Sequence, residues 1–280
     1  MKRFLITAAG GARSETAERL AYDIKSELSR LGAIAHLTAD VDVPDYKPDL
    51  IIAVGGDGTI MRAMKKYSAF AIPTFGINGG DLGFLAGAEA DTWVAALPRL
   101  IAGEYDREER LALQFQFGVD GPVTGPIVNE VYVHHPQVPV AFEARINGHV
   151  LWGKLAARGL LLSTATGSNA QSFSNHGQPL FPTSNDVVLT PMNPQMANVR
   201  AFAFPEVSRS GSVSISLLPG KRGDETVEVW ADGTQYTTAS HLLRIGESIV
   251  ITKAPTPLLL ATFGLPHFFA ALKIKKGYGP

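Results

Sequence analysis

The 280-residue sequence has no cysteine, which excludes a disulfide scaffold, a thiolate zinc site, an iron–sulfur cluster and a cysteine nucleophile. It also lacks an excess of either charge: the 25 Lys and Arg residues nearly balance the 26 Asp and Glu residues. No net positive field therefore attracts nucleic acid or an anionic membrane. No apolar run approaches the roughly 18–20 residues that span a bilayer. The first apolar stretch, 4–9, is shorter than the about 7–15 residues of a signal peptide. We therefore expect a cytoplasmic protein that binds neither nucleic acid nor membrane.

The first hundred residues alternate between strand-like and helix-like patterns. Apolar runs at 4–8, 33–37, 50–54 and 71–75 predict short strands, with a loop around Pro44 and Pro48. A period of 3.6 residues predicts helices over 14–31, 59–67 and 91–102. This alternation predicts an α/β domain with an open parallel sheet over residues 1–104.

From about Glu109 onward the apolar residues alternate with polar ones. This period of two predicts strands over 111–117, 130–134, 140–146, 213–217 and 227–230. Asn147-Gly148 is the strongest hairpin signal, and Asp232-Gly233 predicts a second tight turn. We expect an all-β domain over residues 105–255 and a tail, 256–280, that packs on the first domain.

A glycine-rich loop follows the apolar run 50–54 and opens the next predicted helix. Gly55, Gly56, Gly58 and Thr59 predict a phosphate site, because glycines allow close backbone approach and a helix N-terminus favours anions. Asp57 is a carboxylate placed among them, which suits a base that accepts a proton from a hydroxyl or a group that organises a divalent cation. The structural alternative is a strand–turn–helix corner that only requires glycine.

Two further loops are less specific by themselves. Residues 76–85 form a glycine-rich loop after a predicted strand, and residues 163–172 gather hydroxyls and amides after an apolar run. For the second loop, a polar turn between strands is an equally good interpretation.

Taken in order, these segments resemble the NAD kinase family, which phosphorylates the 2′-hydroxyl of NAD with ATP. Residues 55–59 match its GGDGT motif, and 76–85 look like its GxNxGxLGFL loop. Arg110 falls in its ERxxL segment and 129–130 match its NE pair. Residues 163–174 resemble STPTGSTAYxxS, 190–194 resemble TPxxP, and 232–233 match a late DG turn.

The resemblance implies an α/β N-terminal domain, a β-sandwich-like C-terminal domain that holds most of the dinucleotide site, and a tail returning to the first domain. Asp57 would be the catalytic residue facing the 2′-hydroxyl, with phosphate at the surrounding loop. The substrate-binding residues would be Phe84, Asn129, Glu130, Arg158, Thr166, Asn169, Ala170, Gln171 and Ser174.

The family also implies ligands and an assembly. The acceptor would be NAD(H) and the donor ATP or polyphosphate. Mg²⁺ would be held mainly by the donor phosphates, with no site made of protein ligands alone. A homodimer or homotetramer is expected.

The chain departs from the family pattern in the nucleotide-binding segment. Arg158 stands where the family has Asp, and Asn169 and Gln171 replace a threonine and a tyrosine. A guanidinium near the nicotinamide would repel its cationic, oxidised form and so favour NADH. Alternatively, Arg158 points to solvent or pairs with a carboxylate such as Glu143. For the whole protein, the alternatives are a related GGDGT kinase with a lipid or sugar acceptor, and a non-catalytic dinucleotide-binding homologue.

Overall fold

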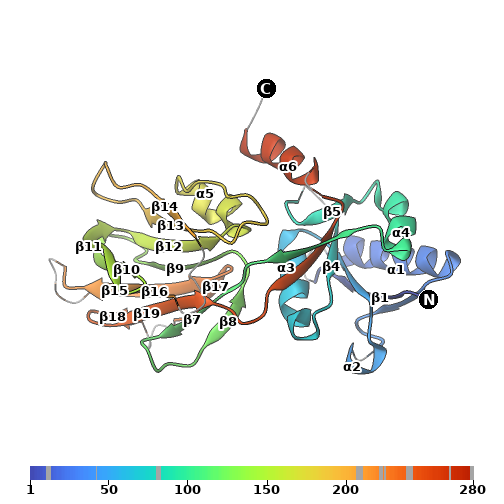
Figure 1. Cartoon of the computed structure of the whole chain (residues 1–280), viewed down its shortest axis with the longest axis horizontal. Coiled ribbons are helices and arrows are strands. Elements are labelled where there is room, and N and C mark those ends of the chain that lie inside the picture. The colour runs from blue at the N-terminus through green and yellow to red at the C-terminus, as the bar shows by residue number, and fades with distance from the viewer. Residues whose placement is uncertain are drawn as a thin grey trace. The chain divides into compact units, whose positions relative to one another are not determined.

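The computed structural model describes residues 1–10, 14–41, 43–79, 83–205, 211–220, 223, 225–237, 242–264 and 266–277. The chain divides into two units, and Figure 1 colours it from blue at the N-terminus to red at the C-terminus. Unit 1 comprises Met1–Glu109 and Leu258–Pro280, and unit 2 comprises Arg110–Pro257. Within the described residues, no helix is both long enough and apolar enough to cross a membrane.

Unit 1 is built on a sheet with the strand order β2-β1-β3-β4-β20-β6, in which β5 also pairs with β4. The pairs of β1 with β2 and β3, and of β4 with β3, β5 and β20, are all parallel. The strands are β1 (Arg3–Ala8), β2 (Ile34–Leu37), β3 (Leu50–Val54), β4 (Thr74–Asn78), β5 (Ala86–Glu89), β6 (Asp106–Arg110) and β20 (Leu258–Thr262). Every residue of β3 is buried, as is typical of a central strand in a parallel sheet.

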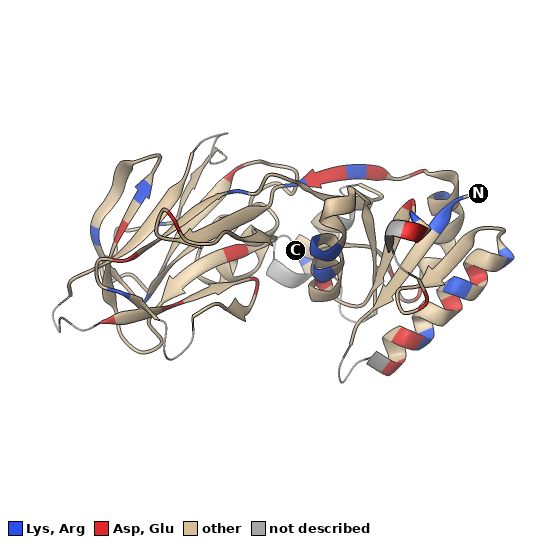
Figure 2. Ribbon diagram, turned by 90° about the horizontal axis from the view of Figure 1, so that it is seen from below, with Lys and Arg blue, Asp and Glu red and all other residues tan. Residues whose placement is uncertain are grey.

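Helices connect these strands or follow them in the chain. They are α1 (Ser14–Arg30), α2 (Val43–Tyr46), α3 (Asp57–Tyr67), the 3₁₀ helix η1 (Ser68–Phe70), α4 (Trp93–Ala102) and α6 (Pro266–Lys276). α1 and α4 belong to one hydrophobic cluster with β1, β3 and β4, to which α1 contributes Ile24 and Leu28. Figure 2 shows residues of both charges following one another along α1, where Arg19 and Glu15 form an ion pair of 2.5 Å. This division into an apolar and a charged side is what the 3.6-residue period predicts.

Three sequence expectations for unit 1 were wrong in detail. The fourth strand covers Thr74–Asn78 rather than 71–75, because Ala71 takes a left-handed conformation (φ 52°) at the end of η1. The expected loop around Pro44 contains the short helix α2, since proline fits the first turn of a helix. The third helix begins at Asp57, two residues earlier than expected, so this carboxylate lies in its first turn.

Unit 2 consists of two antiparallel sheets. One has the order β11-β10-β15-β19-β7-β8, and the other β14-β13-β12-β9-β16-β17, with β18 also paired to β16. The first contains β7 (Leu113–Phe117), β8 (Thr124–Ile127), β10 (Val140–Ile146), β11 (His149–Ala157), β15 (Val213–Leu218) and β19 (Ser248–Lys253). The second contains β9 (Glu130–His134), β12 (Gly159–Thr164), β13 (Val187–Met192), β14 (Phe202–Phe204), β16 (Thr226–Ala231), β17 (Thr234–Gln235) and β18 (Leu243–Arg244).

One hydrophobic core joins the two sheets of unit 2. It includes Phe142 and Ile215 of the first sheet and Val133 and Leu160 of the second. Both predicted hairpins are present, and the residues of each turn have positive φ: 52° and 81° at 147–148, 46° and 75° at 232–233. Two positive values are the signature of a type I′ turn. The predicted fold class is therefore confirmed: an α/β N-terminal part, a β-sandwich, and a C-terminal segment that returns to the first sheet through β20.

Candidate functional site

The glycine loop of unit 1 connects β3 directly to α3. Gly55 has a φ of 145°, and a Cβ atom there would lie 2.7 Å from the Thr59 hydroxyl oxygen, so a side chain does not fit. Gly56 is the N-cap of α3 and caps the helix with no side chain. A helix N-terminus carries backbone N–H groups without partners inside the helix and a partial positive charge, which suits a phosphate group.

The Asp57 carboxylate is held in place by the second glycine-rich loop. Its two oxygens accept hydrogen bonds from the backbone N–H groups of Phe84 and Leu85, each at 3.0 Å. Gly83 makes this approach possible, since a Cβ there would lie 2.6 Å from Asp57 Oδ1. A carboxylate has about four acceptor positions, so two amides leave others available to a ligand. Residues 80–82 of this loop lie outside the described part of the chain.

An arginine that sequence reasoning did not single out lies at the same turn. Arg62 is one helical turn beyond Gly58, and its Nη2 donates to the Thr59 hydroxyl at 3.1 Å. Its Nη1 lies 3.9 Å from the position of a Cβ on Gly58. The only sequence signal was its spacing, because residues four apart share a helix face.

Phe84, a predicted substrate-binding residue, is half-buried in unit 1. Its ring centroid lies 6.2 Å from that of Phe268 in α6. The C-terminal helix therefore lies beside a residue of the loop that binds Asp57.

In unit 2, the pair Asn129 and Glu130 is positioned by Asp232. The Asp232 carboxylate accepts hydrogen bonds from the backbone N–H groups of Val128 (2.9 Å) and Asn129 (2.7 Å). Its own N–H donates to the Glu130 carbonyl at 3.1 Å. The sequence marked Asp232 as a turn residue but not as a residue that orients this pair.

The polar segment after β12 packs on the backbone of the same pair. The Thr164 hydroxyl donates to the Val128 carbonyl at 2.6 Å, and the Thr164 N–H donates to the Asn129 carbonyl at 2.9 Å. Gly167 allows the closest approach: a Cβ there would lie 2.1 Å from the Asn129 carbonyl oxygen. The segment is therefore fitted to Asn129 and is more than a polar connection between strands.

This segment contains the remaining predicted binding residues. It forms the 3₁₀ helix η2 (Gly167–Asn169) and the short helix α5 (Gln171–Ser174), with Thr166 and Ala170 as their N-caps. Buried Arg110 donates to the Thr166 hydroxyl at 3.5 Å, and Ser172 is tied to Thr190 of β13 at 2.9 Å. Ser174 is exposed at the end of α5.

Polar side chains of β9, β12 and η2 include buried atoms that have no hydrogen-bond partner among the described residues. Ser163 lies opposite Glu130 in the strand register, while their neighbours Val131 and Leu162 face the core. Among the described residues, Glu130 Oε2, Ser163 Oγ and Asn169 Oδ1 are buried without a hydrogen-bond partner. Because an unsatisfied buried polar atom costs about 1–3 kcal/mol, such a group calls for an explanation, and a polar ligand supplies one.

The environment of Glu130 changes its acidity. Burial raises the pKa of Glu130 to about 8, and the negative charge of Asp232 adds to the effect. Tyr132, two residues along β9, also has a raised pKa because it is buried, although a hydrogen bond with Gln171 acts in the opposite direction. Gln171 thus lies against the same strand as Glu130.

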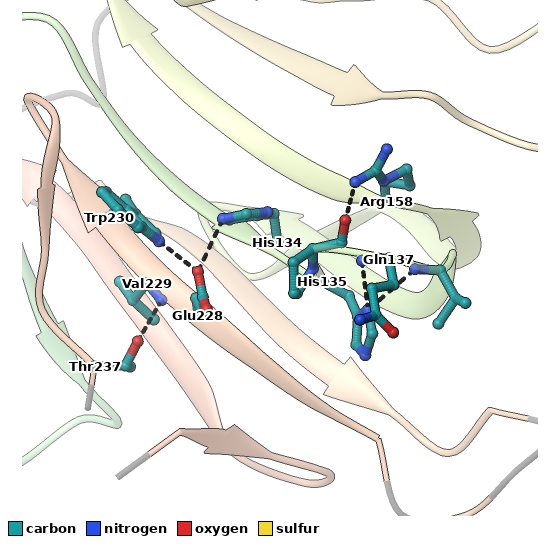
Figure 3. A network of polar contacts seen from close by, with 10 residues as sticks. His134, His135, Gln137, Arg158, Glu228, Val229, Trp230 and Thr237 are labelled. Carbon is teal, nitrogen blue, oxygen red and sulfur yellow. Dashed lines mark hydrogen bonds and ion pairs between the residues drawn. The ribbon is translucent and has the colours of Figure 1, made fainter. Parts of the chain in front are cut away.

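Arg158 is not brought together with these residues. It lies between β11 and β12, five residues from Ser163, which corresponds to about 17 Å along an extended strand. Figure 3 shows its guanidinium donating a hydrogen bond to the carbonyl of Pro136, in the turn after β9. The alternative pairing with Glu143 is wrong, because Glu143 binds Arg145 at 2.6 Å.

A polar and aromatic network lies beside Arg158. Figure 3 shows Glu228 accepting hydrogen bonds from Trp230 Nε1 (2.8 Å) and from His134 Nε2 (3.2 Å). Burial lowers the pKa of His134, Glu228 raises it, and the charge of Arg158 lowers it further. Arg158 therefore lies at the start of β12, beside His134, whereas Glu130 of β9 pairs with Ser163 near the end of β12.

Metal ligands were tested on the same geometry. In the described part of the chain, no three His, Asp or Glu side chains are grouped to hold a metal ion. The two Asp57 oxygens already accept backbone N–H groups. Each oxygen keeps a further acceptor position, so Asp57 could supply one ligand to a magnesium ion.

The chain thus combines an α/β unit that has a GGDGT loop at a helix N-terminus with a β-sandwich in which some polar side-chain atoms are buried without a partner among the described residues. Two family models match the chain, the ATP-NAD kinase N-terminal domain over residues 13–105 and the ATP-NAD kinase C-terminal domain over residues 128–257. The chain belongs to the ATP-NAD kinase family.

Individual relatives agree with this assignment. The chain is 31% identical over 241 residues to the NAD kinase of Gemmatimonas aurantiaca, covering 84% of this chain and 79% of that protein. It is 29% identical over 285 residues to the NAD kinase of Nitratidesulfovibrio vulgaris, covering 98% and 96%.

Two solved structures share the fold at 19% identity. One is an NAD kinase from Archaeoglobus fulgidus in complex with ATP, with a TM-score of 0.73 over 99% of this chain and 100% of that one. The other is yeast NADH kinase complexed with NADH, with a TM-score of 0.76 over 100% of this chain and 88% of that one.

Proposed function

We propose that this protein is an NAD kinase, which transfers the terminal phosphoryl group of ATP, or of polyphosphate, to the adenosine 2′-hydroxyl of NAD(H) and so forms NADP(H). One observation carries the proposal: Asp57 lies in the first turn of α3, inside the glycine loop, with its carboxylate fixed by two backbone N–H groups. The family and the names of the relatives supply the acceptor and the donor.

Asp57 acts as the general base. It accepts the proton of the 2′-hydroxyl while that oxygen forms a bond to the γ-phosphorus and the bond from this phosphorus to the bridging oxygen breaks, releasing ADP. The amides of Phe84 and Leu85 fix the carboxylate, so little reorganisation is needed when the hydroxyl arrives. Gly55, Gly56, Gly58 and Thr59 surround the donor phosphates, and Arg62 supplies a positive charge at the same turn.

The dinucleotide is assigned mainly to unit 2. Asn129, oriented by Asp232, holds the adenine, and Glu130 binds a ribose hydroxyl. The hydroxyl satisfies Glu130 Oε2, which is buried without a partner in the described structure. The segment containing Thr166, Asn169, Ala170, Gln171 and Ser174 completes the proposed contacts of unit 2, and Phe84 is a further proposed substrate-binding residue, in unit 1.

Mg²⁺, when bound with the donor, neutralises phosphate charge, and the donor phosphates hold it. We assign residues 1–104 to the phosphate site, 105–255 to the dinucleotide and 256–280 to the returning tail. We further expect a cytoplasmic homodimer or homotetramer, which size-exclusion chromatography with light scattering tests.

A coupled assay for NADP formation tests the function. The purified protein is incubated with ATP, Mg²⁺ and NAD, and the product is detected with a dehydrogenase that is strictly dependent on NADP. NADP formation supports the proposal. Dinucleotide binding without turnover identifies a non-catalytic homologue, and ATP consumption with a lipid or sugar but not with NAD identifies a kinase with another acceptor.

A further inference from the structure

The sheet of unit 1 changes direction between β1 and β3. From β1 the chain moves outward to β2, whereas from β3 it moves the opposite way to β4. In open α/β sheets, ligands bind outside the carboxyl ends of the two strands where the order reverses. The loop after β3 is the glycine loop, so the loop after β1 lies beside a phosphate site.

The two loops are in direct contact. The Ala9 N–H donates to the Val54 carbonyl at 2.9 Å, and a Cβ on Gly55 would lie 3.0 Å from the Ala9 Cβ. A molecule bound against the end of β1 is therefore next to Gly55 and Gly56.

A cavity of about 260 Å³ opens at this end of β1. It is formed by the carboxyl ends of β1 and β2 and by the N-terminal half of α1. Its lining residues are Ile6, Thr7, Ala8, Ala9, Gly10, Glu18, Ala21, Tyr22, Leu37, Thr38 and Ala39. The cavity shares Ala9 with the glycine-loop contact, so the two sites are continuous.

The chemistry of the lining selects the kind of ligand. None of its described lining residues is Lys, Arg or His, and Glu18 is acidic, so this part of the cavity favours an uncharged group over a phosphate. Thr7 and Thr38 supply hydroxyls that form no hydrogen bond with another described residue. The Tyr22 side chain, 59% exposed, offers a flat ring. Hydroxyls, small apolar side chains and an exposed ring suit an uncharged, planar, hydrogen-bonding group.

The volume of the cavity limits the size of the ligand. It is below the roughly 300–1,000 Å³ typical of pockets that hold a whole drug-sized ligand, so the cavity fits part of a nucleotide and not a dinucleotide. We propose that this cavity binds the nucleoside end of the phosphoryl donor, whose phosphates extend past Ala9 and Gly10 to the glycine loop. The inference rests on the proposed kinase function and assigns residues that the family motifs do not include.

The decisive variant fills the cavity. Ala39 is exposed at its rim, so Ala39→Trp blocks the space with little risk to folding. Ser26→Trp is the matched control, because Ser26 is exposed on α1 and is not a lining residue. A double variant, Thr7→Val with Thr38→Val, removes both hydroxyls while nearly keeping shape and serves if the tryptophan variant fails to fold.

Three quantities are measured for each variant: the KM for ATP, the KM for NAD, and the Kd values of ADP and of inorganic tripolyphosphate by calorimetry. We expect Ala39→Trp to weaken ATP and ADP binding at least about tenfold, and the double variant about three- to tenfold, with NAD and tripolyphosphate changed less than about twofold. Ser26→Trp should match the wild type in all of them.

Two results would overturn the assignment. Equal ADP binding by Ala39→Trp and Ser26→Trp would show that the cavity does not take the nucleoside. An equal loss of ADP and tripolyphosphate binding would show that it takes phosphate. If the wild type forms no NADP, the proposed function fails, but ADP calorimetry still tests the nucleoside assignment. Loss of ADP binding in Ala39→Trp and not in Ser26→Trp supports the assignment. No ADP binding by the wild type refutes it.

Discussion

Glu130 makes the stability of the protein depend on pH in a direction opposite to that of an ordinary surface carboxylate. The side chain is 5% exposed, and its pKa is raised from 4.5 to about 8 by burial and by Asp232. The native state therefore binds the Glu130 proton more tightly than the unfolded chain does. Stability from this group is full below about pH 4.5 and is lost as the pH rises through 8.

The size of the effect follows from the difference between the two pKa values. One pH unit corresponds to 1.36 kcal/mol, so raising the Glu130 pKa to about 8 removes about 4 kcal/mol of unfolding free energy between pH 5 and pH 9. Glu130→Gln keeps the shape and removes the titration. We expect the variant to gain about 4 kcal/mol relative to the wild type over this range.

The measurement is urea unfolding at pH 5, 6, 7, 8 and 9, followed by tryptophan fluorescence. The wild-type value is subtracted from the Glu130→Gln value at each pH, so that all other titrating groups cancel. Glu109→Gln, at an exposed carboxyl, controls for removal of a charge as such. A difference for Glu130→Gln that stays within about 1 kcal/mol from pH 5 to 9 would refute the argument from burial.

Three further outcomes are expected. Asp57→Asn should lower kcat by about 10²–10⁴ with NAD binding retained, and more than a third of the wild-type kcat would show that Asp57 is not the base. Gly167→Ala should lower the melting temperature and weaken NAD binding, because the new Cβ would lie 2.1 Å from the Asn129 carbonyl oxygen. Gly153→Ala is the control and should have neither effect, since the atom nearest to its Cβ lies 3.6 Å away. Arg158→Asp should change the NAD/NADH ratio of kcat/KM by less than about threefold, because the guanidinium is bound to the Pro136 carbonyl and is not free to face a nicotinamide; a tenfold change would contradict this reasoning.

Elements with a clear local pattern were predicted closely. The strands β9 and β10 match the predicted 130–134 and 140–146, because apolar and polar residues alternate along both segments. β4 was misplaced because a strand buried on both faces has no alternation, and Gly76 and Asn78 continue it through contacts with β3 and β5.

The residues of the candidate site likewise fall into those that the sequence predicted and those that it missed. Motif order located Asp57, Asn129 and Glu130, but not the groups that position them. Asp232 binds Asn129 across 103 residues, and the Phe84 amide binds Asp57 across 27. Such partners follow from tertiary packing, which no local period records. The role expected for Arg158 near the nicotinamide stays a prediction; the structure adds that its guanidinium donates to the Pro136 carbonyl.

The return of β20 to the first sheet has a consequence for synthesis. Unit 1 needs Leu258, Leu260 and Ala261, which are buried beside β4, yet these residues leave the ribosome after all of unit 2. Unit 2 is continuous and can fold while the chain is still being made, whereas the first sheet waits with an open edge along β4. The unit that contains the glycine loop and Asp57 is thus completed last, so a ribosome that stops early releases a chain whose glycine loop has no finished sheet behind it.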